Sequence, residues 1–96
     1  MGKYVYIYTG GGMAETPEEQ EAVFAAWGAW FGELGAAVVD GGNPFGQSTV
    51  VGGGTATATG YSIVSADSLE DAATLAKGCP ILTSGGAVAV HEALDM

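Results

Sequence analysis

Hydrophobic positions alternate along residues 3–9 with a period of two. Tyrosines fill one set of alternate positions, and Val5 and Ile7 fill the other. Aromatic and β-branched residues at this period are typical of a β-strand. The sequence therefore predicts a strand over residues 3–9 whose two faces differ, and the tyrosines of one face are Tyr4, Tyr6 and Tyr8.

After a glycine run, the period changes to steps of three and four, which predicts a helix that ends near Gly35. Thr16 is placed to be the N-cap and Glu19 to complete a capping box. Pro17 suits the first helical position. The apolar stripe of this helix consists of Val23, Trp27, Trp30, Phe31 and Leu34.

The second half of the chain repeats the strand and helix signals. A short apolar strand is predicted over residues 36–40 and a longer one over residues 60–66. Asp67 is the expected cap of a second helix that reaches about Lys77, and a last strand is predicted over residues 87–94. Residues 43–59 fit either a hairpin with arms at 47–51 and 55–59 or a mobile Gly/Thr-rich loop.

The predicted order is βαββαβ, which is typical of the α+β ferredoxin-like fold. In this fold a four-stranded antiparallel sheet carries two helices on one face. If Val88 and Val90 lie under the helices, His91 lies on the open face. If Val5 and Ile7 also lie under the helices, the tyrosines lie on the open face too, and a second copy is the expected cover.

Composition narrows the possible partners. The chain of 96 residues has a net charge of −9, and Lys3 and Lys77 are its only basic side chains. Two cations are too few to neutralise nucleic acid or to hold an anionic membrane surface. No apolar run reaches the ~20 residues of a membrane helix, and the N-terminus does not read as a signal peptide. We therefore expect a cytoplasmic protein, and the low charged fraction of 14% favours a homodimer.

Five segments resemble the YCII-related family. They are the tyrosine-rich first strand with its Gly-Gly, residues 27–35, Val39 to Gly46, Gly60 to Ile63, and Ala76 to Pro80. The resemblance covers nearly the whole chain and implies a single YCII-related domain over residues 1–96 that forms a dimeric α+β barrel. Some members are proposed to act through a histidine–aspartate pair in a cleft, and one relative is a muconolactone dehalogenase.

Those members tend to place the histidine in the first helix, where this chain has Ala26 and Trp27. His91, in the last predicted strand, is its only histidine. Histidine is the side chain that changes charge near neutral pH, so His91 is the candidate general acid or base. It shares a face with Ala87 and Ala89, whose small size leaves room for a ligand. Two interpretations are open: a cavity lined by His91 and tyrosines, or a dimer interface packed by those tyrosines.

Asp40 is the candidate partner of His91, because it ends a strand before a Gly-Gly turn. In the predicted topology the two residues lie apart in one subunit and meet, if at all, across a dimer. The alternative for Asp40 is turn chemistry, in which its carboxylate accepts hydrogen bonds from nearby backbone N–H groups.

Further candidates are ligand contacts at Tyr6, Tyr8, Asn43, Phe45 and Tyr61. The Asn43-Pro44-Phe45 run fits either a rim over a cavity or a rigid turn with a buried phenylalanine. The glycines at 10–12 lack the spacing and the lysine of a phosphate loop, so a turn is expected. Cys79 is expected to be structural, and no ligand set for a metal is visible.

Two function classes follow. The first is a cofactor-independent enzyme with lyase, isomerase or dehalogenase chemistry, in which His91 and Asp40 are catalytic and Tyr6 and Tyr8 donate hydrogen bonds. The alternative is a non-catalytic homodimer that binds a small ligand or another protein. Neither class requires a metal or an organic cofactor.

Overall fold

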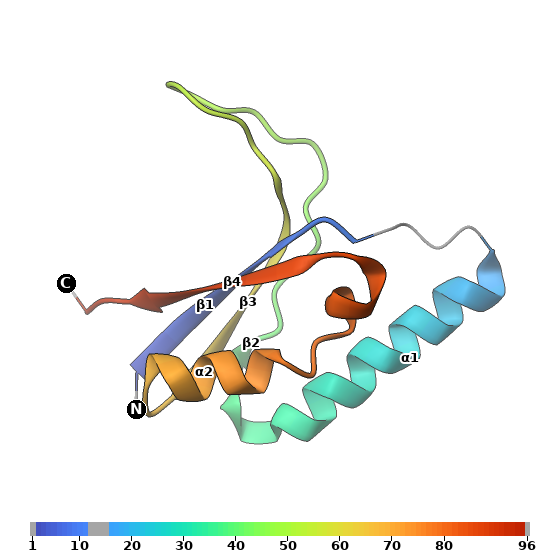
Figure 1. Cartoon of the computed structure of the whole chain (residues 1–96), viewed down its shortest axis with the longest axis horizontal. Coiled ribbons are helices and arrows are strands. Elements are labelled where there is room, and N and C mark those ends of the chain that lie inside the picture. The colour runs from blue at the N-terminus through green and yellow to red at the C-terminus, as the bar shows by residue number, and fades with distance from the viewer. Residues whose placement is uncertain (1, 12–15, 96) are drawn as a thin grey trace.

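The computed structural model describes residues 2–11 and 16–95 and has the predicted α+β ferredoxin-like arrangement (Figure 1). The strands form one antiparallel sheet in the order β2-β3-β1-β4, and both helices cover the same face. Of the glycines at 10–12, Gly12 lies outside the described residues. The elements are β1 (Gly2–Thr9), α1 (Pro17–Leu34), η1 (Gly35–Ala37), β2 (Val38–Asp40), β3 (Ala58–Ala66), α2 (Leu69–Ala76), η2 (Pro80–Ser84) and β4 (Ala87–Ala93).

Both helices begin at side-chain caps. The Thr16 hydroxyl accepts a hydrogen bond from the backbone N–H of Glu19, which confirms the predicted start of α1. The prediction that Asp67 caps α2 is wrong by one residue. Ser68 is the cap, because its extended backbone lets its hydroxyl accept from the N–H of Asp71.

The tyrosines of β1 lie on the face opposite to the predicted one. Tyr4, Tyr6 and Tyr8 are buried under the helices, whereas Val5 and Ile7 are half-buried on the open face. The physical reason is the small size of the helix residues above them. Ala72 and Ala76 are the buried residues of α2, so large rings are needed to fill the space between helix and sheet.

Trp30 joins three elements of the core. It is 3% exposed and stacks on Tyr6, with ring centroids 6.0 Å apart. Its indole N–H donates to the carbonyl oxygen of Leu75 at 3.1 Å, and the Tyr6 hydroxyl donates to the carbonyl oxygen of Ala72. These bonds tie α1 and β1 to α2 and satisfy the polar ends of both buried rings.

The segment between β2 and β3 does not form a hairpin, which was one of the two conformations that its sequence fits. One isolated bridge joins Pro44 to Gly60, and the Phe45 N–H donates to the Thr59 carbonyl oxygen. Beyond this point residues 46–57 form an exposed arm without strand structure, which projects from the body of the molecule (Figure 1). The loop interpretation therefore holds for this segment.

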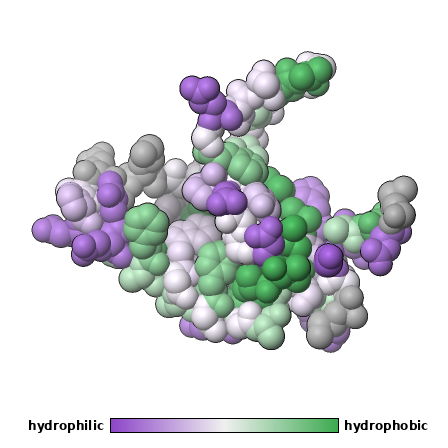
Figure 2. All heavy atoms as spheres, turned by 180° about the vertical axis from the view of Figure 1, so that it is seen from behind, coloured by the Kyte–Doolittle hydropathy of each residue, from purple (hydrophilic) through white to green (hydrophobic). Residues whose placement is uncertain are grey.

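The open face of the sheet is aliphatic at its centre. Val5, Ile7 and Ile63 are half-buried there, and no helix among residues 2–11 and 16–95 covers them. Figure 2, seen from behind, shows hydrophobic residues gathered in the middle of the molecule. Within the same described ranges, no helix is long and apolar enough to cross a membrane.

Candidate ligand-binding cavity

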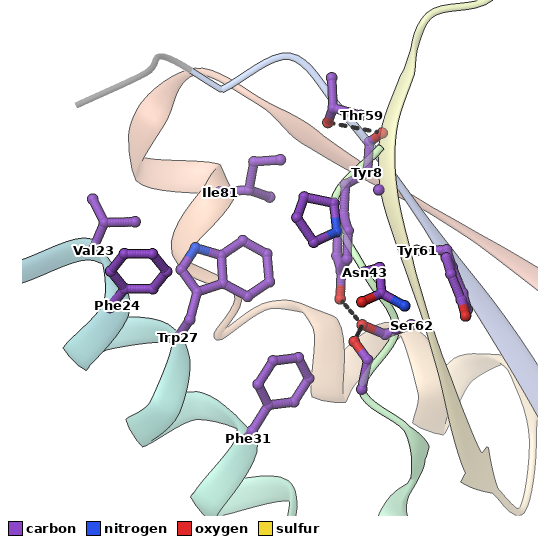
Figure 3. Close-up of a pocket in the computed structure, with 14 residues that line it drawn as sticks. Tyr8, Val23, Phe24, Trp27, Phe31, Asn43, Thr59, Tyr61, Ser62 and Ile81 are labelled. Carbon is purple, nitrogen blue, oxygen red and sulfur yellow. Dashed lines mark hydrogen bonds between the residues drawn. The ribbon is translucent and has the colours of Figure 1, made fainter. Parts of the chain in front are cut away.

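A cavity of about 360 Å³ lies on the helix-covered side of the sheet (Figure 3). It is formed by one face of α1, the glycine turn that follows β2, the first half of β3 and the start of η2. Its lining residues are Tyr8, Val23, Phe24, Trp27, Phe31, Gly41, Gly42, Asn43, Pro44, Thr59, Gly60, Tyr61, Ser62 and Ile81.

The helix side of the cavity is aromatic. Phe24, Trp27 and Phe31 follow one another at steps of three and four, which places them on one face of α1. Trp27 packs edge-on against Tyr8 across the cavity, with ring centroids 5.1 Å apart and planes at 84°. The apolar stripe that predicts the helix therefore also supplies the wall of the cavity.

Glycine is required where the chain turns against β3. Gly42 has φ +74°, and a Cβ atom there would overlap the backbone of Tyr61. A Cβ atom at Gly60 would lie 3.2 Å from the carbonyl oxygen of Asn43. Gly42 therefore needs a residue without a side chain, and a side chain at Gly60 would make a tight contact, so that the turn and β3 close one side of the cavity by backbone contact.

The opposite wall carries a short chain of hydrogen bonds. The Tyr8 hydroxyl donates to Ser62 Oγ at 2.8 Å, and Ser62 Oγ donates to the carbonyl oxygen of Gly41 at 2.7 Å. Both side chains are buried. Burial raises the pKa of the Tyr8 hydroxyl far above its ordinary value of 10.0, and the hydrogen bond to Ser62 opposes this only in part. Tyr8 therefore keeps its proton at neutral pH.

The described residues that line the cavity include no histidine, cysteine, lysine or carboxylate. The cavity is thus suited to an uncharged ligand held by apolar contact and a few hydrogen bonds. Among the described part of the chain, no group of three or more His, Cys, Asp or Glu side chains is placed to hold a metal ion.

Asp40 lies beside the cavity but on the open face of the sheet. Its exposed carboxylate accepts a hydrogen bond from the N–H of Gly42 at 2.8 Å and one from the hydroxyl of Tyr61 at 3.4 Å. The first bond is the turn chemistry expected as the alternative role of this aspartate.

His91 is exposed on β4 and lies on the open face, opposite Val5 of β1. Val5 is also paired with Ile63, and Ile63 with Asp40. The two candidate catalytic residues therefore occupy opposite ends of one row across four strands, about 14 Å apart at a strand spacing of about 4.8 Å. A single copy of the chain does not bring them together.

The five predicted ligand contacts separate into three groups. Tyr8 and Asn43 line the cavity, and Tyr61 borders it while its ring lies on the far side of β3 (Figure 3). Phe45 stacks on Tyr61, with centroids 5.9 Å apart. Tyr6 is 0% exposed and bonded to α2, so it has no access to a ligand.

Sequence reasoning missed Phe24, Phe31 and Ser62 as cavity residues. The helix stripe signals only that a residue is buried and leaves open whether protein or ligand fills the space. Ser62 does have a signal, because it is the polar residue on the buried side of a strand otherwise lined there by Val64 and Ala66. A buried hydroxyl requires a partner and therefore marks a polar point in the core.

Comparison with known proteins identifies the fold. No family model and no curated protein matches the chain. Among solved structures, the chain is similar to 5-chloro-2-hydroxyhydroquinone dehydrochlorinase from Burkholderia phenoliruptrix, solved in complex with 2,5-dihydroxybenzoquinone. The alignment has a TM-score of 0.59 and 19% identity, and it covers 100% of this chain and 96% of the other.

Proposed function

We propose that this protein binds a small, uncharged ring compound in the cavity between α1 and the sheet. The observation that carries the proposal is the composition of that cavity, which has aromatic walls, one hydrogen-bonded Tyr8–Ser62 pair and no charged group among its described lining residues. Its volume of about 360 Å³ is at the small end of ligand pockets, which span roughly 300–1,000 Å³. The structurally similar dehydrochlorinase, whose crystal holds a six-membered ring compound, supports a ligand of this size.

We propose further that the chain is a member of the YCII-related family, one domain over residues 1–96, and forms a homodimer through the open face. The half-buried Val5, Ile7 and Ile63 would lie against a second copy, as in a dimeric α+β barrel. Sheets pack face to face at about 10 Å, a distance at which such side chains interdigitate.

A blocked cavity tests the binding proposal. Val23 lines the cavity at an exposed position of α1, so Val23→Trp fills the space without disturbing the core. Ala22→Trp adds the same ring to the neighbouring position, which does not line the cavity. We expect single-ring and fused two-ring compounds, screened by ligand-observed NMR, to bind the wild type and Ala22→Trp but not Val23→Trp.

Two results would contradict this proposal. One is the failure of every ring compound to bind the wild type at millimolar concentration. The other is unchanged binding to Val23→Trp, which would place the ligand elsewhere on the molecule.

A second candidate function is acid–base catalysis by His91 and Asp40 across the dimer. It is favoured by their position in one row of the open face, at its two ends. A two-fold axis parallel to the strands through the middle of that row places each His91 opposite the Asp40 of the other copy. His91 then transfers the proton and Asp40 orients its ring.

Disulfide trapping tests this arrangement without a known substrate. The double variant Asp40→Cys, His91→Cys should form covalent dimers under mild oxidation, because the two thiols would face each other between subunits. Each single variant is the matched control and should remain uncrosslinked, since it lacks a facing thiol. Covalent dimers of His91→Cys alone would instead indicate an axis that pairs like residues, and would contradict the catalytic arrangement.

A further inference from the structure

The direction of the hydrogen bonds along the Tyr8–Ser62–Gly41 chain is fixed by its last member. Gly41 contributes a carbonyl oxygen, which can only accept. The hydrogen of Ser62 Oγ must therefore point to Gly41, at 2.7 Å. Ser62 then receives the hydrogen of Tyr8, at 2.8 Å, and neither hydroxyl has a hydrogen left for a ligand.

The hydroxyl of Thr59 also donates its hydrogen to a backbone carbonyl. Thr59 Oγ1 donates to the carbonyl oxygen of Tyr8 at 3.2 Å, with a longer contact to that of Gly10 at 3.5 Å. The hydroxyl oxygens of these three side chains therefore have only lone pairs available for a ligand. The hydroxyl groups of the cavity thus offer acceptors to a ligand and no free donor.

Three other polar side chains line the cavity. Tyr61 has its ring on the far side of β3, and its hydroxyl donates to the Asp40 carboxylate at 3.4 Å. Asn43 is exposed, so water competes for its amide and weakens any preference that it imposes. The ring nitrogen of Trp27 lies on the side of its indole toward Val23 and Phe24, away from Tyr8 and Ser62 (Figure 3). The buried polar wall therefore retains its acceptor character.

We infer that the cavity selects uncharged ring compounds that carry an N–H or O–H donor, and that Ser62 determines this selectivity by holding the Tyr8 hydrogen. A ligand with only acceptors would leave its own buried oxygen unpaired against lone pairs on the wall, which is unfavourable. An anion would in addition meet a protein with a net charge of −9. The inference rests on the proposed function, since it concerns the ligand of the same cavity.

Indole and benzofuran provide the sharpest test, because they share one shape and differ in a ring N–H against a ring oxygen. We expect indole to bind the wild type about 5-fold more tightly by calorimetry or NMR titration, the usual net effect of one neutral hydrogen bond. Ser62→Ala releases the Tyr8 hydrogen, so the indole-to-benzofuran ratio should fall toward 1. Acetophenone, which has only an acceptor, should bind this variant more tightly than the wild type.

Ser65→Ala is the matched control, because it makes the same change on the same strand at a half-buried position of the open face. It should keep the wild-type ratio. Equal affinity of indole and benzofuran in the wild type would overturn the inference while leaving the proposed cavity in place. An unchanged ratio in folded Ser62→Ala would overturn the role of Ser62. Failure of these three compounds and of every other ring compound in the screen to bind the wild type would remove the proposed function and the inference together.

If Ser62→Ala does not fold, the comparison of indole with benzofuran in the wild type still tests the selectivity of the cavity. Tyr8→Phe then serves as the second variant, because it removes one of the three acceptor hydroxyls and should weaken indole more than benzofuran. Equal weakening of the two compounds would count against the inference.

Discussion

The two faces of the sheet are built from the same strands but carry different chemistry. The helix-covered face holds buried aromatic rings whose polar ends are bonded within the protein, as in Tyr6 and Tyr8. The open face holds half-buried aliphatic residues and, at its edges, the exposed Asp40 and His91. Successive side chains of a strand point to opposite faces of the sheet. The cavity therefore lies on one face, and Asp40 and His91 lie on the other.

This separation limits what a single copy of the chain can do. A ligand in the cavity meets apolar surface and neutral hydroxyls, which favours binding over proton transfer. The candidate acid–base residues Asp40 and His91 lie on the other face of the sheet, at opposite ends of one row, so a site that used both would need a second copy of the chain. The comparison thus makes distinct predictions for changes to each face.

The largest effect is expected on the helix-covered face. Trp30→Ala removes a buried ring, its stack on Tyr6 and its bond to the Leu75 carbonyl oxygen. We expect the free energy of unfolding to fall by about 3–5 kcal/mol in a chemical denaturation experiment. Ile63→Ala on the open face should cost the dilute protein less, because Ile63 is only half-buried in the single chain. Equal losses for the two variants would contradict the difference between the faces.

The next effect concerns assembly through the open face. Ile7→Asp places a charge near the centre of the proposed interface. Burying an unpaired carboxylate costs several kcal/mol, so the dimer should dissociate about 100-fold more readily in sedimentation experiments. Leu82→Asp, at an exposed position of η2, is the control and should leave the dimer intact. A wild type that is monomeric at micromolar concentration would contradict the proposed dimer.

Alkaline titration should reveal the buried tyrosines. Desolvation raises the pKa of Tyr6 from 10.0 to about 12. Above pH 10 the unfolded chain releases this proton first, so stability that is present below pH 10 is lost as the pH rises toward 12. Tyr6→Phe removes the ionisable hydroxyl and should flatten this part of the stability curve, although it lowers stability at neutral pH by about 1 kcal/mol. A steep alkaline decline that persists unchanged in Tyr6→Phe would assign it to other groups.

The smallest effect is expected at His91. It is exposed on β4 and does not line the cavity, so His91→Ala should change the unfolding free energy by less than about 0.5 kcal/mol. Affinity for ring compounds should also stay within about two-fold of the wild type, as measured by NMR titration. A large loss of affinity would show that the two faces are coupled and would favour a site that joins them.

The elements themselves could be predicted because their signals are local. The Thr16 cap and the period-two pattern of residues 60–66 each depend on neighbouring residues only, and both are confirmed. The face of β1 could not be predicted this way. Both of its alternate sets are apolar, so the choice depends on the small Ala72 and Ala76 far along the chain.

The cavity depends even more on distant contacts. Tyr8 and Ser62 are separated by 54 residues, and the sequence contains no signal that their hydroxyls meet. Asp40 and His91 lie at the two ends of one row of paired residues. Their separation within one chain could be predicted, because it follows from the order of the strands. The arm at residues 46–57 carries a Val/Thr pattern typical of strands, but it has no neighbouring strand on which to pair.

The pair of indole rings on α1 also has a spectroscopic consequence. Trp27 and Trp30 meet edge to face, with centroids 5.7 Å apart and planes at 79°. Rings this close couple their electronic transitions, so the pair should give a circular dichroism signal separate from that of the helices. Trp27 lines the cavity and Trp30 is fixed in the core, so an occupant that displaces Trp27 changes this signal while the helix signal stays constant. Binding of a ligand in the proposed cavity could therefore be followed by this signal without an attached label.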